Sequence, residues 1–529
     1  MSGPVWITAT PPTPNGELHV GHIAGPYVAG DVLRRFLAAD KVEVHYTTGL
    51  DDHQSYVAVR GLKDGGRTGG EVADGYGVSI VRVWQQAEVG FDNVVHPRKE
   101  DGYLAYVQDF LHRLYDAGHV VARTRPLPYC TPCQRWLYEA YLTGKCPHCG
   151  SSSNGNACEP CGRPNDCADL AEPQCTVCDT PAEIRDAARL YFPLAPLADR
   201  LKTFWTAVDM PPHLRVLCDR MLADGLPEIA VSHPGEWGVP VTVPGFEDQR
   251  VYVWFEMAPG YLWELPASER EKGNWPAAVQ FFGFDNGYFH AVLFPALYAV
   301  LHPGAALARA FVVNEFYQLE GLKFSTSRQH AIWAHEALAE AGSDVLRHHV
   351  LADRPNGRQT SFTRADLART QELLTVQWNG WLERLFAAVA HDSDGRAPEE
   401  RPEGPAWQRL RARLERTVAE LREAYSVEGF DPRRAVALLN EVVAGVNDFW
   451  YVHEHERDRS PSAHRAALTA QLAVAGALSA WAAPVMPAGA ARLAALLGED
   501  ADRAVDAAAL TPPPAGQPLT LPDRPVFGD

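Results

Sequence analysis

The chain has 529 residues, which is too long for one hydrophobic core, so we expect roughly three to five domains. Hydrophobic residues make up 46% and charged residues 22%, and 48 Lys and Arg against 66 Asp and Glu give a net charge of −18. This balance excludes a general nucleic-acid coat protein, which needs a basic surface to collect phosphates, but it leaves room for a local RNA-binding patch.

The sequence predicts a protein without a membrane partner. No apolar run approaches the roughly 20 residues that cross a bilayer. The first residues, MSGPVWITATPPTPNGELHVGH, lack the basic start and apolar stretch of a secretory signal. We therefore expect a soluble, cytoplasmic chain, and we expect it to be a monomer.

The first elements in chain order predict an α/β fold. Residues 4–10, PVWITAT, form a short β-branched run that ends in a Pro- and Gly-containing turn. A long helical pattern follows over 22–40, and the next strand-like run, VEVHYTTGLDD, covers 42–52. A strand, a helix and a second strand in this order form a βαβ unit, which predicts a parallel sheet.

A cysteine-rich segment interrupts this pattern over 116–232. Nine of the ten cysteines fall between residues 130 and 178, and eight of them form four C-x-x-C pairs. Two such turns complete a tetrahedral zinc site with four thiolates. A disulfide framework fits poorly because cytosolic thiols stay reduced, and a redox site needs only one C-x-x-C. The spacing predicts one structural zinc ion at Cys146, Cys149, Cys158 and Cys161, and a second at Cys130, Cys133, Cys175 and Cys178.

Strand and helix alternation resumes after the cysteines, so the sheet is predicted to be split by an insertion. The charged, Pro- and Gly-rich segment 391–405 is typical of an exposed linker. Beyond it the chain is rich in Ala, Leu, Arg and Glu at helical spacing, which predicts a helical bundle.

The N-terminal turn, PNGELHVGH, carries the first candidate chemistry. His19 and His22 are three residues apart and so lie on one face of a helix start, and Gly21 leaves room for a ligand against the backbone. A helix N-terminus favours phosphate, and two imidazoles beside it suit nucleotide binding. The alternative is a helix cap with two surface histidines.

This turn resembles the H-I-G-H signature of the class I aminoacyl-tRNA synthetases, and GLKFSTS (321–327) resembles their K-M-S-K-S loop. Within class I the chain is most similar to methionyl-tRNA synthetases. The motifs TTGLDDH, VWFEMAPGY, FFGFDNGYFH and APVMP, together with the paired C-x-x-C turns, carry that similarity along nearly the whole chain.

The resemblance implies a Rossmann-type α/β catalytic domain, split by a zinc-knuckle insertion and followed by an α-helical bundle. The catalytic halves would be 1–115 and 233–330, and the connective insertion 116–232. A region like the family's stem-contact segment would cover 331–390. A domain like the family's anticodon-binding domain would cover 391–529.

The resemblance also implies roles for individual residues, with ATP as substrate together with Mg²⁺. The catalytic residues would be His19, His22 and Lys323. The ATP-binding residues would be Pro12, Asn15, His19, Gly21, His22, Lys323, Ser325 and Ser327. The amino acid would be bound by Thr13, Asp51, Trp254, Tyr261, Asn286 and His290, with Asp51 holding the α-ammonium group.

Several positions depart from the family pattern. At the catalytic site, Thr326, Phe284, His233, Asn286 and Thr13 replace the usual residues. In the helical domain, Glu456 stands where a tryptophan would stack on the anticodon, and Gly380 stands at an anticodon-reading asparagine, although Arg384 is retained. Replacing an aromatic side chain that stacks on a base removes roughly 1–3 kcal/mol of binding free energy per base.

These departures lead to three hypotheses. The first is an enzyme that forms an aminoacyl adenylate with an amino acid smaller or more polar than methionine. It would then pass this amino acid to a small-molecule amine or hydroxylamine in natural product biosynthesis. The alternative is a conventional methionine–tRNA ligase. The third is a non-catalytic binding protein that keeps only the fold.

Overall fold

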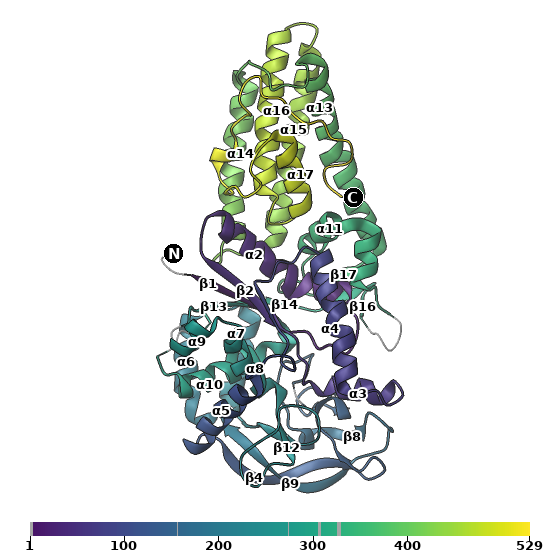
Figure 1. Cartoon of the computed structure of the whole chain (residues 1–529), viewed down its shortest axis with the longest axis vertical. Coiled ribbons are helices and arrows are strands. Elements are labelled where there is room, and N and C mark those ends of the chain that lie inside the picture. Colours follow the sequence, from purple (N-terminus) through teal and green to yellow (C-terminus); the bar gives the residue numbers. More distant parts are fainter. Residues whose placement is uncertain (1–3, 156, 273–274, 305–307, 325–329, 529) are drawn as a thin grey trace.

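The computed structural model describes residues 4–155, 157–272, 275–304, 308–324 and 330–528. A broad α/β part and a narrower helical part are stacked along the longest axis (Figure 1). Within the described residues, no helix is both long and apolar enough to cross a membrane.

A five-stranded parallel sheet forms the centre of the α/β part, with the strand order β14-β13-β1-β2-β3. Ile7 of β1 pairs with Tyr46 of β2 on one side and with Val279 of β13 on the other. The central strand therefore joins strands that precede the insertion to strands that follow it, which confirms the predicted split sheet. The strands are β1 (Val5–Ala9), β2 (Val44–Gly49), β3 (Asn93–Val95), β13 (Ala278–Gly283) and β14 (Ala310–Asn314).

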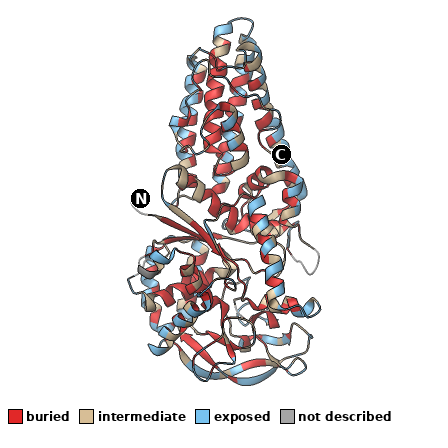
Figure 2. Ribbon diagram, viewed as in Figure 1, coloured by how far each residue is buried: buried red, intermediate tan, exposed pale blue. Residues whose placement is uncertain are grey.

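Helices cover both faces of this sheet, which explains why all five residues of β1 are buried rather than alternating between buried and exposed. Val5, Ile7 and Ala9 belong to one buried cluster, and Trp6 belongs to another on the opposite face. Buried residues accordingly fill the strands and the inner sides of the helices (Figure 2). The first face packs against α2 (Val28–Ala39), α4 (Gly69–Gln86) and α11 (Ala334–Ala352), and the second against α5 (Tyr103–Asp116), α8 (Val253–Trp263) and α10 (Phe294–Leu301).

The helical segment after β1 brings its two histidines to the edge of the sheet. It begins as α1 (Val20–His22), with His19 at the N-cap, and widens into the π-helical turn η1 (Ile23–Tyr27) before α2. Pro26 lies inside that turn and lacks the N–H that an α-helical hydrogen bond requires, which accounts for the irregular geometry.

The insertion is a long antiparallel ribbon that carries two knuckles. Its sheet has the order β10-β9-β4-β5, and β4 pairs with β9 from Val121 opposite Tyr191 to Tyr129 opposite Glu183. A small sheet of order β7-β6-β8 is formed by the residues that lie between β4 and β9 in the sequence. The strands are β4 (Val121–Cys130), β5 (Arg135–Trp136), β6 (Leu142–Lys145), β7 (Ser152–Ser153), β8 (Ala171–Cys175), β9 (Glu183–Pro193) and β10 (Glu228–Ala230).

Shorter elements connect the insertion to the second half of the sheet and the sheet to its helices. The helices are α3 (Ser55–Lys63), α6 (Ala198–Ala207), α7 (Pro212–Asp224) and α9 (Ala267–Lys272). The strands are β11 (Ser232–Pro234), β12 (Gln249–Val251), β15 (Tyr317–Leu319), β16 (Leu322–Lys323) and β17 (Thr360–Phe362).

The C-terminal part is helical, as predicted, but the segment 391–405 is not simply an exposed linker. It does connect two helices, yet Ala397 and Pro398 are buried, and the Ala397 N–H donates to the Gln517 carbonyl at 2.9 Å. The segment is therefore held against the C-terminal tail. The helices are α12 (Arg364–Leu373), α13 (Gly380–Asp392), α14 (Gly404–Tyr425), α15 (Pro432–His453), α16 (Pro461–Trp481) and α17 (Pro487–Leu497).

Candidate active site

A cleft of about 670 Å³ opens at the carboxyl ends of the central strands. Thr10 follows β1, Asp51 follows β2, Gly283 ends β13 and Asn314 ends β14, and all four line it. The strand order reverses at β1, because β2 lies on one side of it and β13 on the other. In α/β proteins, ligands bind in the crevice outside the carboxyl ends of the strands at such a reversal. The cleft therefore lies where the topology places a ligand.

His19 and His22 lie side by side in this cleft. Their ring centroids are 3.8 Å apart, and the His19 backbone N–H donates to Nδ1 of His22 at 3.1 Å. Burial lowers the pKa of His22 to about 4, and burial together with the neighbouring His22 and Lys323 holds the pKa of His19 well below its usual value. Because Nδ1 of His22 accepts a hydrogen bond, its neutral ring carries the proton on Nε2, where it is available to a phosphate oxygen.

Gly21 lies between these histidines and lines the cleft, but the space on its Cβ side is occupied by neighbouring rings. A Cβ atom there would stand 3.0 Å from the His19 ring and 3.4 Å from Phe324. Phe324 also stacks on the His19 ring, with centroids 4.3 Å apart and planes 4° from parallel. The glycine therefore allows His19 and Phe324 to pack together, which positions the first signature against the second.

Lys323, on β16, also lines the cleft. Its ammonium group forms an ion pair with Glu159, which belongs to the C-E-P-C turn of a knuckle. The other residues predicted in this loop, Ser325 and Ser327, and the departure at Thr326 lie outside the described residues.

Asp51 is a buried carboxylate with an incomplete set of partners. Its Oδ2 accepts from the Thr13 hydroxyl at 3.1 Å and from Gln54 Nε2 at 3.3 Å. Its Oδ1 is buried and has no partner among the described residues. Burial and the negative charge of Glu256 raise the pKa of Asp51 to about 8. A cation brought to Oδ1 would satisfy this atom and restore the ionised form.

The predicted amino-acid-binding residues form two layers. Trp254 and Asn286 line the cleft, and Trp254 stacks on Phe289 with centroids 3.8 Å apart. Tyr261 and His290 are buried behind them, with the Tyr261 hydroxyl 3.4 Å from His290 Nε2. They do not line the cleft and so support its wall.

The structure thus gathers most of the predicted residues and adds others. Pro12 and Thr13 also line the cleft, whereas Asn15 does not and is placed by a backbone hydrogen bond to Thr13. The sequence prediction missed Asp285 and Phe289, although both belong to the FFGFDNGYFH motif. Local patterns offered no signal for Gln54, Asn154, Glu159 and Asn314, which reach the cleft only through the tertiary fold.

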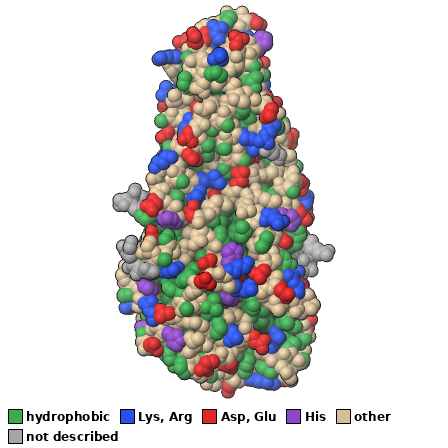
Figure 3. Space-filling view, in the orientation of Figure 1, with side chains coloured by type: hydrophobic (Ala, Val, Ile, Leu, Met, Phe, Trp, Pro, Cys, Tyr) green, Lys and Arg blue, Asp and Glu red, His purple; other side chains and the backbone are tan. Residues whose placement is uncertain are grey.

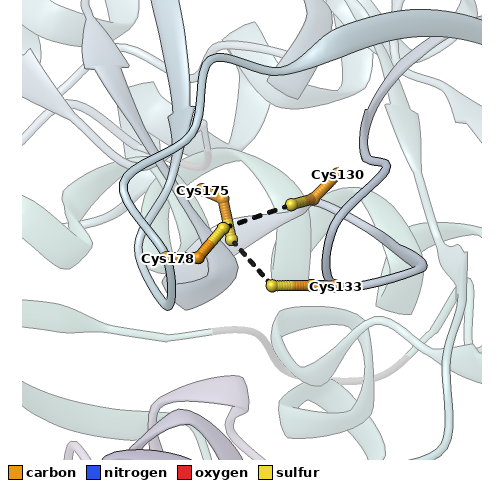
Figure 4. A group of neighbouring side chains, drawn as sticks. All are labelled: Cys130, Cys133, Cys175 and Cys178. Atoms are coloured by element: carbon orange, nitrogen blue, oxygen red, sulfur yellow. Dashed lines mark hydrogen bonds between the residues drawn. The ribbon is translucent and has the colours of Figure 1, made fainter.

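The eight predicted cysteines form two separate clusters, grouped as the spacing predicted. In the first, the Sγ atoms of Cys130 and Cys178 are 3.4 Å apart and those of Cys133 and Cys175 are 3.9 Å apart (Figure 4). In the second, the corresponding pairs are Cys146 with Cys161 at 4.0 Å and Cys149 with Cys158 at 3.5 Å.

These distances test whether each cluster fits a metal ion. A tetrahedral zinc ion about 2.3 Å from each sulfur separates the sulfurs by roughly 3.8 Å, so both clusters fit one. Four thiolates leave no position for water, which makes a structural role the natural one. Cys167 and Cys218 are buried outside both clusters.

Comparison with known proteins identifies the family. Residues 5–385 match the family model described as tRNA synthetases class I (M). The methionine–tRNA ligase of Thermomicrobium roseum is 31% identical over 407 residues, covering 73% of this chain and 68% of the relative. The chain belongs to the methionyl-tRNA synthetase family. The methionine–tRNA ligase of Dehalococcoides mccartyi is 29% identical over 550 aligned positions and covers 100% of this chain and 97% of the relative.

A solved structure agrees on the fold. The crystal structure of Mycobacterium tuberculosis methionyl-tRNA synthetase bound by methionyl-adenylate superposes with a TM-score of 0.82 at 22% identity, covering 99% of this chain and 100% of that one. The Rossmann-type class I synthetase fold with a knuckle insertion and a helical C-terminal part is therefore confirmed.

Membership of this family makes the chain a ligase that forms an aminoacyl adenylate. The hypothesis of a non-catalytic binding protein does not fit this finding. The comparisons also favour the conventional hypothesis over transfer to a small molecule, because the relatives named above are methionine–tRNA ligases. No finding supports a role in natural product biosynthesis.

Proposed function

We propose that the protein activates methionine with ATP and Mg²⁺ and transfers it to tRNA. The observation that carries this proposal is the meeting of His19, His22, Lys323 and Asp51 in one cleft at the carboxyl edge of the sheet. His19, His22 and Lys323 can bind the phosphates of ATP, and Asp51 can bind the ammonium group of an amino acid. An enzyme that joins ATP to an amino acid needs both kinds of group in one site.

The chemistry asked of these residues is positioning and charge stabilisation. The methionine carboxylate attacks the α-phosphate of ATP, and pyrophosphate leaves with the electron pair of the broken P–O bond. His19 and His22 would donate to the phosphates, and Lys323 would neutralise charge on the leaving group. Asp51 would hold the α-ammonium group, with Trp254 and Asn286 beside the side chain.

We assign the two cysteine clusters to structural zinc. We also propose the domain division that the sequence predicts: catalytic halves at 1–115 and 233–330, the insertion at 116–232, a stem-contact-like region at 331–390 and an anticodon-binding-like domain at 391–529.

A surface of the helical part supports tRNA as the acceptor. Tyr451 is 58% exposed, and the Arg384 guanidinium lies 5.8 Å from the centre of its ring. Arg384 is held by Asn447, which accepts from Nη2 at 2.6 Å. An exposed aromatic ring beside a fixed guanidinium is a stacking platform for an unpaired base. Tyr451 thus offers a stacking group that the linear comparison at Glu456 had missed.

One observation favours a second candidate, a small amine or hydroxylamine as acceptor. Glu454 and Asp458 are exposed close to Tyr451 in the chain, and they would repel the phosphates of RNA. Acidic and basic side chains are also interspersed over the face in Figure 3, without one large basic field.

Two assays test the proposal. ATP–pyrophosphate exchange with each of the twenty amino acids should be most efficient with methionine, and His22→Ala should lower kcat about 10²- to 10³-fold. The control His112→Ala changes a histidine of α5 outside the cleft and should leave exchange unchanged. Exchange with another amino acid but not with methionine would contradict the assigned substrate.

The acceptor is decided by charging methionine tRNA. Tyr451→Ala should lower aminoacylation roughly 5- to 150-fold, as expected for loss of about 1–3 kcal/mol of base stacking, and should leave pyrophosphate exchange unchanged. Efficient exchange without any charging of methionine tRNA would favour the small-molecule acceptor.

A further inference from the structure

A second cavity, of about 330 Å³, lies beside the active-site cleft, and no described residue lines both. Its volume is at the lower end of the range of about 300–1,000 Å³ that is typical of small-molecule sites, which suits an amino acid better than a nucleotide. The cavity lies between the insertion and the second half of the catalytic domain, and its walls include Arg125, Asn165, Arg189, Ala230, His233 and Tyr288.

Three of the residues that line this cavity each have one buried polar atom without a partner among the described residues: Arg189 Nε, the Tyr288 hydroxyl and Asn165 Oδ1. Arg189 and Tyr288 are almost fully buried, with 0% and 1% of their surfaces exposed. An unpaired buried polar group is unfavourable by about 1–3 kcal/mol, so native proteins rarely keep three in one place without a ligand or water to satisfy them.

The rest of the Arg189 guanidinium is firmly placed. Nη2 donates to both carboxylate oxygens of Asp166 at 3.2 Å, and Nη1 lies 3.3 Å from Nδ1 of His233. Burial and the charge of Arg189 hold the pKa of His233 well below its usual value, so His233 is neutral and accepts from Nη1. Both Nη groups therefore have at least one protein partner, whereas Nε has none among the described residues and can donate to a ligand.

Four of the charged residues that line the cavity form two ion pairs. Arg125 is paired with Glu228, and Arg163 is paired with Asp224. Asp169 also lines the cavity and is in no ion pair among the described residues, so its carboxylate favours a cationic group on the ligand. The unpartnered buried atoms add hydrogen-bonding selectivity. Arg189 Nε is a donor, Asn165 Oδ1 is an acceptor, and the Tyr288 hydroxyl can be either.

The cavity and the cleft are adjacent and are separated by a common wall. The Tyr288 ring packs edge-on against Phe289, with centroids 4.9 Å apart, and Phe289 lines the cleft. Asn165 Nδ2 donates to Ser153 Oγ at 2.9 Å, and Ser153 also lines the cleft. The two ligand spaces are therefore separate but adjacent.

We infer that this cavity is a second small-molecule site, which binds a free α-amino acid or a zwitterion of the same class. The carboxylate accepts from Arg189 Nε and the Tyr288 hydroxyl, and the ammonium group donates to Asn165 Oδ1. This site is independent of the proposed function of the cleft.

The test is isothermal titration calorimetry of the full chain with each of the twenty amino acids. Asp51→Asn serves as the background, because it weakens binding in the cleft and leaves the second cavity unaltered. At least one amino acid should still bind to this variant. Adding Tyr288→Phe should weaken that binding about three- to tenfold, which corresponds to the loss of one hydrogen bond.

Tyr191→Phe is the matched control. Tyr191 also has a buried hydroxyl without a partner among the described residues, but it does not line the cavity. Both substitutions remove an unsatisfied hydroxyl, so neither should lower the melting temperature of the free protein, and only Tyr288→Phe should weaken binding. Ala230→Leu adds side-chain volume inside the cavity and should abolish binding of the amino acid there.

The inference is overturned if no amino acid binds the Asp51→Asn variant at millimolar concentration, or if Tyr288→Phe and Tyr191→Phe bind equally well. Pyrophosphate exchange distinguishes failure of this inference from failure of the function proposed for the cleft. Tyr288→Phe should keep normal exchange, and a wild-type chain that binds in the second cavity but shows no exchange would contradict the proposed function alone.

Discussion

Lys323 of the second signature forms an ion pair with Glu159 of a cysteine knuckle. The two residues are 164 positions apart in the chain, and their side chains are 52% and 51% exposed. An ion pair at this exposure is worth about 0–1 kcal/mol, so the phosphates of ATP can displace Glu159 from the lysine. The knuckle therefore holds Lys323 at the edge of the cleft with an anion that ATP must replace.

Glu159→Gln should consequently improve ATP binding. Removing the competing carboxylate should lower KM for ATP up to about fivefold in pyrophosphate exchange, with KM for methionine unchanged. Glu172→Gln is the control, because Glu172 forms an exposed ion pair with Lys145 in the same insertion and does not line the cleft. A rise in KM for ATP would show that Glu159 aids ATP binding instead.

Methionine binding should strengthen as pH rises from about 7 to about 8, where Asp51 ionises. Only the ionised carboxylate attracts an ammonium group, so KM for methionine should fall over this interval while KM for ATP does not. Asp51→Asn should raise KM for methionine about 10- to 100-fold and remove the pH dependence. A pH-independent KM in the wild type would assign the ammonium contact to another group.

Asp51 should also affect stability, with a sign that follows from its raised pKa. The folded chain keeps the proton up to pH about 8, whereas the unfolded chain loses it near the ordinary value of 3.8, so this group lowers stability as pH rises between those values. Asp51→Asn should therefore melt at a higher temperature than the wild type at pH 9, and this difference should be clearly smaller at pH 5, where only a minor part of the wild-type loss has occurred. Equal melting curves at both values would contradict a buried, uncompensated carboxylate.

Elemental analysis should find two zinc ions per folded chain. Cys130→Ser and Cys146→Ser should each remove one of them, because each substitution breaks a different cluster. Cys218→Ser should keep both, since this buried thiol lies on α7 outside the clusters. Less than one ion per chain in unchelated protein would refute the assignment.

A buried ion pair should stabilise the packing of α11 against α2. Arg347 of α11 donates to Asp31 of α2 at 2.7 Å, with both side chains fully buried. Arg347→Met should reduce the free energy of unfolding by about 3–5 kcal/mol, because it leaves a buried carboxylate with one cation fewer. Arg364→Met, which breaks an exposed pair with Glu340, should cost about 0–1 kcal/mol in the same denaturant titration. Similar losses in both variants would argue against a special role for the buried pair.

Sequence patterns predicted the features that depend on neighbours along the chain. The run PVWITAT predicted a strand because β-branched residues pack well on a pleated surface, and the three-residue spacing of His19 and His22 placed both on one helix face. The four C-x-x-C turns predicted two tetrahedral clusters because each turn fixes two thiols within a few residues. Local logic placed Gly21 at the cleft but could not foresee Phe324, which is 303 residues away in the chain and packs on the neighbouring ring of His19.

By itself, then, the sequence determined the split parallel sheet, the cysteine groups and the family. Only the tertiary structure decided that Glu159 meets Lys323, that Arg347 is buried against Asp31, and that Tyr288 and Asn165 border a second cavity. The physical reason is that periodicity and ligand spacing are local properties of the chain. The meeting of distant side chains depends instead on how the β4–β9 ribbon and the C-terminal helices pack against the sheet, which no short segment encodes.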